Sequence, residues 1–359
     1  MPTSLRKTIF IVLLVAFIMV EALVAAPFLP VSLDFDQTFY PAIRYALAGE
    51  NPYQTEYEYL EANPGAPPNF FSPPWLLLIL LPFGFFPLEL ARALWMIFLT
   101  GVTAVGIRLM HPAKGFKGLW PFALVALPWS LVGILFGQVS ALVLLGAVIC
   151  IMELESEESG FPSTLKLLAG LLLVGLKPQL GGLIALPVIM WMAWRRDKRL
   201  TPILLIGLPV IGLTLLVSQL VQDAENVYRI APLWQSTLER ELIVWSQPLW
   251  LAHLVRILVL GTMAAWAWRT RRLDTGWWSA WLAAVLIITP YTRAYDGVLL
   301  LPLFGQIASR RQWRQAGVFL LITILYIQLP TGELGSIVAP LAAWLLFVPW
   351  RNIFPIAKQ

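Results

Sequence analysis

Residues 33–53 read LDFDQTFYPAIRYALAGENPY and place two carboxylates, Asp34 and Asp36, soon after the apolar run of residues 8–29. That run is longer than the apolar core of a cleavable secretory signal, which spans about 7–15 residues. We interpret it as an uncleaved first membrane helix, with a signal peptide as the alternative. The two acids therefore stand at the edge of the hydrocarbon layer, where ionised groups are costly.

The first large loop is residues 29–73, which carry six acidic side chains against one basic side chain, Arg44. That lack of positive charge favours the outer side of a membrane. Apolar residues recur at helical spacing over 38–48, which predicts a short interfacial helix. Gly49 is expected to end it, because glycine readily adopts the left-handed backbone found at helix C-termini.

The composition of the whole chain agrees with a membrane protein. It has 359 residues, of which 59% are hydrophobic and 13% charged, and its mean hydropathy is +0.76. A soluble domain is about 25% charged. We expect one all-α membrane domain, residues 1–359, without a nucleic-acid partner. The single Cys150 excludes an intrachain disulfide, and two histidines are too few to suggest a histidine-based metal site.

The order of the predicted spans follows from hydropathy and positive charge. Lysine and arginine concentrate in RRDKR (195–199), RTRR (269–272) and RRQWR (310–314), which are expected in the cytoplasm together with both termini. About thirteen apolar segments can be marked, several of them shorter than the roughly 20 residues that a span requires. They are 8–28, 74–88, 91–107, 118–134, 139–152, 165–176, 178–194, 201–220, 249–268, 275–290, 297–308, 315–330 and 337–350.

Two cytoplasmic termini require an even number of spans, so the expected fold is a bundle of about 12 transmembrane helices. Either 74–88 enters and returns without crossing, or 165–194 forms one long span. Four prolines in and around 74–88 favour the first alternative. The acidic run ELESEE at 153–158 is interpreted as a solvated loop without a function.

Ionisable side chains beside the predicted spans on the outer side are functional candidates by default. A carboxylate at an apolar rim can serve as a general base, and Arg293 with Lys177 could hold a phosphate. Each has a simpler explanation: an acid after a helix can be a cap, Lys177 can be a snorkelling lysine before Pro178, and Gln138 can belong to a turn that starts a helix.

Six segments in order carry a resemblance to a known family. They are DF…FYPAIRYALAGENPY, FSPPWLLLILLPFGFFPLELARALW, FGQVSALVLLGAVI, AGLLLVGLKPQLGGLIALP, SQPLW and ITPYTRAYDGVLLLPLF, within about residues 30–305. In this order they resemble glycosyltransferase family 87, whose members are GT-C-type membrane enzymes that use polyprenyl-phosphate sugars. The resemblance implies a GT-C fold with short interfacial helices in the first outer loop, and a catalytic aspartate early in that loop.

Carried onto this sequence, the resemblance makes Asp36 or Asp34 the general base. The Asp-Phe pair of the family pattern matches Asp34, whereas counting back from Tyr40 favours Asp36, which we place slightly ahead. The other acid is expected to hold Arg44 or a backbone amide. The donor phosphate is expected at Arg293 and Lys177. The remaining substrate-binding candidates are Tyr40, Arg44, Tyr53, Gln138, Gln247, His253, Tyr291, Tyr295 and Asp296.

Two departures from the family pattern bear on the acceptor: Ser246 replaces an asparagine, and Tyr295-Asp296 stands where relatives often have histidine. The expected function is inverting transfer of a sugar, mannose by resemblance, from a polyprenyl-phosphate donor to a lipid or glycan hydroxyl. It needs no cofactor or metal, because lipid phosphate is a good leaving group. We expect a multi-pass protein of a prokaryotic plasma membrane with its active site on the outer face. The alternatives are a transporter or flippase of a lipid-linked glycan, and a scaffold.

Overall fold

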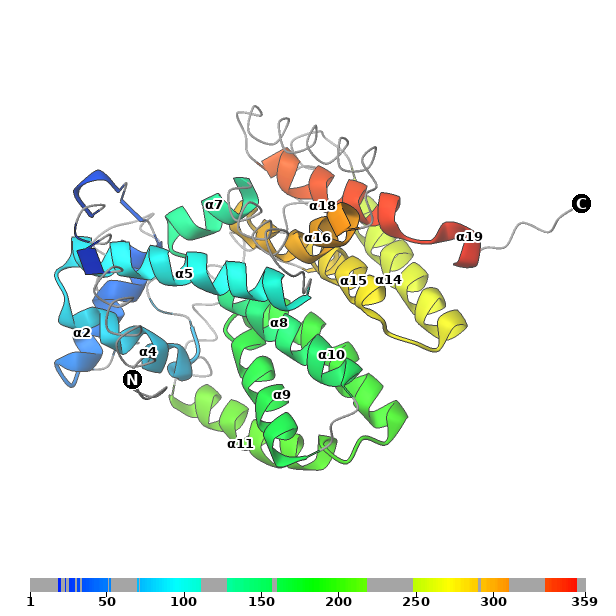
Figure 1. The fold of residues 1–359 in the computed structure, drawn as a ribbon, viewed down its shortest axis with the longest axis horizontal. Coiled ribbons are helices and arrows are strands. Elements are labelled where there is room, and N and C mark those ends of the chain that lie inside the picture. The colour runs from blue at the N-terminus through cyan, green and yellow to red at the C-terminus, as the bar shows by residue number, and fades with distance from the viewer. Residues whose placement is uncertain are drawn as a thin grey trace, which may run out of the picture. The chain divides into compact units, whose positions relative to one another are not determined.

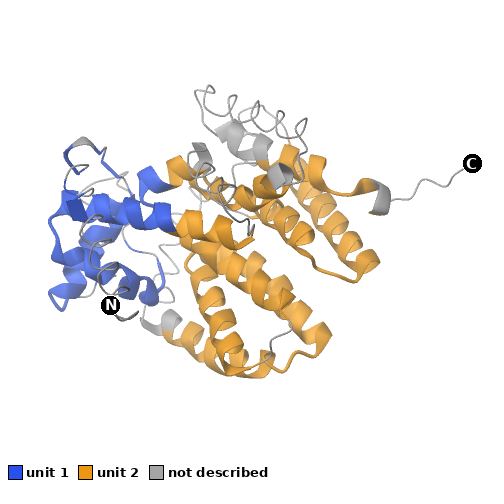
Figure 2. Cartoon of the chain, in the orientation of Figure 1, with its two compact units in different colours: residues 1–101, 134–138, 214–221 blue, residues 102–133, 139–213, 222–359 orange. Residues whose placement is uncertain are grey.

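The computed structural model describes residues 19–20, 23, 26–29, 31–32, 34–50, 52, 70, 72–110, 128–156, 160–217, 248–289, 292–309 and 333–353. Within these ranges the regular structure is helical and contains no β-strand (Figure 1). The all-α prediction is therefore confirmed for the part of the chain that is described. The contacts divide the chain into two compact units, which Figure 2 colours separately. The prediction of one membrane domain stays a prediction.

Unit 1 takes in residues 1–101, 134–138 and 214–221, and unit 2 takes in the rest. The elements that lie in or begin in unit 1 are η1 (Ala26–Phe28), η2 (Phe35–Phe39), α2 (Tyr40–Leu47), α4 (Pro74–Leu80), η3 (Leu81–Phe85) and α5 (Leu88–Met110). The later elements are α7 (Pro128–Phe136), α8 (Ser140–Glu155), α9 (Phe161–Val174), α10 (Pro178–Arg195), α11 (Leu200–Val217), α14 (Trp250–Thr270), α15 (Thr275–Ile288), η6 (Ala294–Leu300), α16 (Leu301–Ser309), α18 (Glu333–Phe347) and α19 (Trp350–Ile353).

The predicted apolar segments form helices wherever the structure describes them. Segment 315–330 and most of segments 8–28 and 118–134 lie outside the described residues. Residues 165–194 do not form one continuous helix, and the number of times they cross a membrane stays a prediction. α9 ends at Val174 and α10 begins at Pro178, a position that suits proline because the first turn of a helix needs no backbone N–H donor there. Segment 74–88 is broken into α4 and the 3-10 helix η3, as its prolines indicate.

Within the described ranges, α5 and α14 are long and apolar enough to cross a membrane. Four further apolar helices are shorter. This result supports membrane association and leaves the number of spans a prediction. Large apolar side chains on α10, α11 and α14 are also exposed, among them Leu186, Met190, Leu205, Leu208 and Ile257.

In unit 1, the loop after the first apolar run forms a helix that starts earlier than predicted. Residues 35–39 make one π-helical stretch, which continues into α2, and Gly49 ends the segment with φ +77° as expected. Phe35 stacks on Trp95 of α5 with ring centroids 5.9 Å apart. The Trp95 indole donates a hydrogen bond of 2.8 Å to the Gly137 carbonyl. These contacts fix the start of the first loop against α5.

Gly137 is required at this junction for two reasons. Its φ of +73° lies in the left-handed region, which side chains with a Cβ disfavour. A Cβ on Gly137 would also approach the Phe35 Cβ and the Ser32 Oγ to 2.6 Å each. The Gly-Gln pair in the FGQVS segment therefore serves packing as well as the turn before α8.

In unit 2, close helix packing depends on small residues. A Cβ added to Gly146 of α8 would come within 2.6 Å of the Gly170 carbonyl oxygen of α9. Small residues allow such close backbone approach, which drives helix association where lipid is the solvent. α15 is the core helix of this unit, since residues 276–288 are all buried.

Pro187 inside α10 leaves a carbonyl without its helical donor, and a tryptophan supplies the missing bond. Proline has no backbone N–H, so the Leu183 carbonyl four residues earlier loses its usual partner. The Trp281 indole of α15 donates to that carbonyl at 3.0 Å. Neighbouring helices commonly satisfy backbone groups freed by proline in membrane helices.

Gly137→Ala is expected to destabilise the protein, because alanine at this position combines left-handed backbone with overpacking. The first effect costs about 1–2 kcal/mol and the second about 1–3 kcal/mol. The thermal midpoint in detergent, followed by near-ultraviolet circular dichroism, measures the loss. Gly101→Ala in α5 is the matched control, because its Cβ meets nothing within 4 Å. Equal midpoints for the two variants would contradict the packing described for Gly137.

Candidate functional site

The acidic turn, residues 34–39 of unit 1, is held by one arginine. Arg92 of α5 donates from Nε to Asp36 Oδ1 at 2.9 Å and from its terminal nitrogen to Oδ2 at 2.7 Å. The Ser32 backbone amide also donates to Oδ2 at 3.1 Å. Both side chains of the ion pair are less than a tenth exposed. This bidentate pair keeps Asp36 in a fixed orientation.

The two acids have different surroundings. Residues two apart in a helical turn do not face each other, so Asp34 and Asp36 project to different sides. Asp36 faces Arg92, which the sequence analysis did not single out although it lies within the quoted segment LELARALW. A backbone amide contact was expected for the acid that is not the base, but it is Asp36, the acid that the spacing favoured as base, that accepts from the Ser32 amide.

Arg44 does not hold either acid as was considered. It donates to the Gly84 carbonyl at 3.2 Å, and Tyr40 donates to the Phe86 carbonyl at 2.8 Å. Both bonds attach α2 to the segment around η3. A Cβ on Gly84 would come within 2.3 Å of Ile43, so α2 packs directly on the η3 backbone. Where the structure describes their contacts, Tyr40 and Arg44 hold the loop in place.

Asp34 and Asp36 are separated by one residue, a spacing that can bind a metal ion. Here the Arg92 guanidinium already occupies both oxygens of Asp36. A metal ion would have to displace that cation. Within the described residues, no group of three or more His, Cys, Asp or Glu side chains is placed to hold a metal.

Unit 2 contains a second charged cluster around Asp296, which is completely buried in η6. Lys177 places its Nζ 2.7 Å from Asp296 Oδ1, and the Ser140 hydroxyl donates to the same oxygen at 2.7 Å. The Arg293 backbone amide donates to Oδ2 at 3.0 Å. These donors come from α8, from the residue before α10, and from the chain entering η6. Asp296 therefore connects three segments.

The surroundings of Lys177 are those of a buried ion pair and not of a snorkelling lysine. Its side chain is 9% exposed and its ammonium lies 4.2 Å from the centre of the Tyr295 ring. The opposite charges of Lys177 and Asp296 cancel. With the half-buried Arg293 included, the three side chains have a net charge of +1. Such a cluster favours an anionic group. Ser140 was missed, because one serine in an apolar helix gives no signal of its partner.

The remaining predicted site residues divide between the units. Gln138 is buried in unit 1 directly after Gly137. His253 is exposed on α14 of unit 2, where its Nδ1 lies 3.4 Å from an Arg256 nitrogen. Tyr53, Gln247 and Tyr291 lie outside the described residues.

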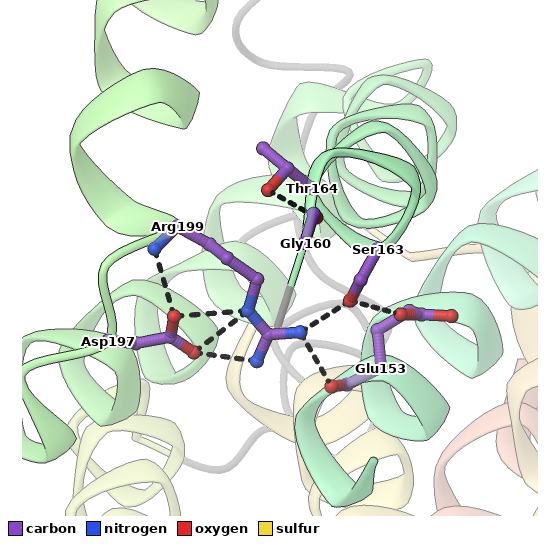
Figure 3. Close-up of polar contacts among 6 residues, drawn as sticks. All are labelled: Glu153, Gly160, Ser163, Thr164, Asp197 and Arg199. Carbon is purple, nitrogen blue, oxygen red and sulfur yellow. Dashed lines mark hydrogen bonds and ion pairs between the residues drawn. The ribbon is translucent and has the colours of Figure 1, made fainter. Parts of the chain in front are cut away.

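A third polar cluster lies at the ends of α8, α9 and α10 (Figure 3). The Arg199 guanidinium donates to the Glu153 carbonyl at 3.0 Å and to the Ser163 hydroxyl at 2.6 Å, and Ser163 donates to the Glu153 carboxylate. The interpretation of 153–158 as a solvated loop is wrong for Glu153, which is buried in α8. The sequence could not indicate this because its partners lie 10 and 46 residues away.

Asp197 in the same cluster has a pKa that reflects its arginine neighbour. Burial by itself raises the pKa of Asp197, but hydrogen bonds and the charge of Arg199 outweigh burial and lower it below the ordinary value of 3.8. Arg199 contacts Asp197 at 2.6 Å. This ion pair caps the turn between α10 and α11 and has a structural role.

No protein-family model, curated protein or solved structure matches the chain. The resemblance to glycosyltransferase family 87 therefore rests on the six segments quoted above. What the candidate residues do has to be argued from their own geometry.

Lys177→Met is expected to destabilise unit 2 by about 3–5 kcal/mol, because it leaves Asp296 buried without its counter-charge. Adding Asp296→Asn should recover part of that loss. The buried Cys150, which is the only cysteine, reports unfolding when a thiol-reactive fluorophore gains access. Lys166→Met is the matched control, since Lys166 pairs with Glu153 but its side chain is 55% exposed. A loss as large in the control would contradict a special role for the buried pair.

Stability is expected to fall in acid partly through Asp197. Because folding lowers its pKa, its contribution is complete above the unfolded pKa near 3.8 and disappears as pH falls through the lower folded value. Asp197→Asn should be less stable than wild type at pH 6, and the difference should shrink below pH 4. Denaturation midpoints across this range measure it. Lys198→Gln, a neighbouring change that leaves the ion pair intact, should keep the wild-type acid dependence.

Proposed function

We propose that this chain is a multi-pass membrane glycosyltransferase. It transfers a sugar from a polyprenyl-phosphate donor to a hydroxyl of a lipid or glycan acceptor at the outer face of a prokaryotic plasma membrane. The family resemblance suggests this reaction class and favours mannose as the sugar. The observation that carries the proposal is the Asp36–Arg92 ion pair, because it anchors the acidic turn that the reaction requires.

Membrane embedding is supported by three features. α5 and α14 have the length and hydropathy of spans. Apolar side chains on α10 and α11 are exposed, as lipid-facing residues are. The basic clusters stand beside apolar helices, which is typical of cytoplasmic anchors. We therefore retain the proposal of about 12 spans with both termini in the cytoplasm.

We place Asp34 ahead of Asp36 as the general base, which reverses the ranking suggested by residue spacing. Both oxygens of Asp36 already accept hydrogen bonds from Arg92, so an acceptor hydroxyl would have to compete with the guanidinium for them. Asp36 then acts as a positioning residue that fixes the turn carrying Asp34. Catalytic side chains work best when a rigid element holds them.

In the proposed step, the acceptor oxygen attacks the anomeric carbon as its proton passes to the Asp34 carboxylate. The bond between that carbon and the phosphate oxygen breaks, and the lipid phosphate leaves with the electron pair. Attack from the opposite side inverts the configuration. A cation at the phosphate would stabilise the charge that grows there, which is where electrostatic catalysis contributes most, and the family resemblance gives that role to Arg293. Asp296 orders the Arg293 backbone, and Lys177 neutralises Asp296.

Paired variants test the base. Asp34→Asn should bind donor normally but lower turnover by about 10²–10⁴-fold, the usual contribution of a general base. Asp36→Asn should also lose stability, because Arg92 is left buried without its partner. Transfer of radiolabelled mannose from polyprenyl-phosphate mannose in detergent measures activity, and donor binding is measured separately. Glu89→Gln, an exposed acid of α5, is the matched control and should remain active.

The same assay separates the enzyme from a transporter of lipid-linked glycans. Transfer needs no second compartment, whereas transport does. Wild-type transfer with full activity in Asp34→Asn would reject Asp34 as the base. Absence of transfer by the wild-type protein, combined with donor movement across a reconstituted bilayer, would reject the glycosyltransferase and favour the transporter.

A further inference from the structure

The C-terminal ends of α10 and α14 meet through tryptophan rings. Trp194 of α10 and Trp268 of α14 have ring centroids 6.3 Å apart, and Trp191 lies at the same distance from Trp194. Figure 1 shows both helices running toward the lower right, where these ends lie. Both helices stop at an arginine with left-handed backbone, Arg196 with φ 52° and Arg271 with φ 48°. Two basic turns therefore flank one row of tryptophans.

We name this region the Trp–Arg surface. Its members are Trp191, Trp194, Arg195, Arg196 and Lys198 after α10, and Trp268, Arg269, Arg271 and Arg272 after α14. The outer tryptophans are open to the surroundings, Trp194 at 56% and Trp268 at 65%. Arg195 lies over the Trp191 ring at 5.4 Å and Arg271 over the Trp268 ring at 5.7 Å.

The surface is strongly positive. All six of its cations are exposed. Two carboxylates are close by in the sequence, and both are engaged. Asp197 pairs with a seventh cation, Arg199, and Asp274 accepts the Trp277 amide at the start of α15. Asp197 also acts on the charge of Arg195, and Glu155 accepts a hydrogen bond from Thr275 nearby. These carboxylates are fewer than the exposed cations, so the surface keeps an excess of positive charge, which favours an anionic ligand.

An exposed apolar stripe leads into the tryptophans. Leu186, Met190 and Trp194 follow one another at four-residue spacing on α10, and all are exposed. The distance from Leu186 to Arg195 is about 14 Å at 1.5 Å per residue, roughly half the hydrocarbon thickness of a bilayer. α14 repeats the order, with Ile257 and Leu258 exposed before Trp268. Apolar, aromatic and basic side chains thus follow one another in the sequence expected at a membrane interface.

We propose that the Trp–Arg surface binds the phosphate headgroups of anionic phospholipids in the cytoplasmic leaflet. Tryptophan side chains are enriched at the level of the lipid headgroups. An arginine that lies over a tryptophan ring can still donate hydrogen bonds to phosphate oxygens. Anionic lipids attract each nearby cation by about 1 kcal/mol. The continuous apolar stripe favours a lipid over an acidic protein, because a lipid covers the stripe with its chains and the cations with its headgroup. The inference rests on membrane embedding but not on sugar transfer.

Lipid selectivity tests the proposal. The full chain is reconstituted in phosphatidylcholine bilayers with spin-labelled phosphatidylglycerol or spin-labelled phosphatidylcholine, and the fraction of motionally restricted label is measured by electron spin resonance. Wild type should prefer phosphatidylglycerol about three- to tenfold at low salt. The combined variant Arg195→Gln, Arg196→Gln, Arg271→Gln and Arg272→Gln should lower that preference to about twofold or less.

Two controls make the outcome specific. The combined variant Lys114→Gln, Lys117→Gln, Arg310→Gln and Arg311→Gln removes the same charge from other basic stretches and should keep the preference. Trp194→Phe with Trp268→Phe should lower it partly, because phenylalanine is a weaker cation–π partner than tryptophan. Equal association of both labels with wild type, or an equal loss in the charge control, would overturn the proposal. The first of these results would leave an acidic protein as the partner of the surface. Neither result affects the test of sugar transfer.

Discussion

Lys177 and Asp296 are 119 residues apart in the chain, yet their charged atoms lie 2.7 Å apart in the interior of unit 2. Either charge alone would be costly among these apolar helices, so each requires the other. The pair sets where α10 begins relative to η6, and Ser140 adds α8 to the same point. The arrangement of unit 2 around its candidate site depends on this requirement.

The need of a buried polar or charged side chain for a partner is met elsewhere in the molecule as well. Asp36 pairs with Arg92 across 56 residues in unit 1, and Arg199 contacts Glu153 and Ser163 where α8 ends and where α9 and α11 begin. In each case a polar side chain of one helix completes a group on another. Trp281 does so without charge, since it supplies the donor that Pro187 lacks. Polar contacts of this kind select one packing among many that apolar contacts alone would allow.

Under the proposed function, these pairs position the residues that react rather than react themselves. The groups that the resemblance made catalytic or phosphate-binding, Asp36 and Lys177, are committed to internal partners. Asp34 and Arg293 are the groups proposed to react. The Asp36–Arg92 pair fixes the segment that carries Asp34, and the Lys177–Asp296 pair fixes the segment that carries Arg293. The exposed Trp–Arg surface differs from both sites, because its cations are directed outward from the protein.

The sequence alone was enough to predict the all-α class, the helix after the first apolar run with its end at Gly49, and the break that prolines make in segment 74–88. These features are local, because periodicity, glycine and proline act within a few residues. It also singled out Asp36, Lys177 and Asp296 as important.

Their partners could not be predicted, since Arg92, Ser140 and Arg199 carry no local mark of the residue they meet. A pair separated by 56 or 119 positions is decided by how helices pack in space, and that packing depends on many weak contacts at once. For this reason the sequence determined which residues were candidates, and only the tertiary structure decided which partners Asp36, Lys177 and Asp296 have.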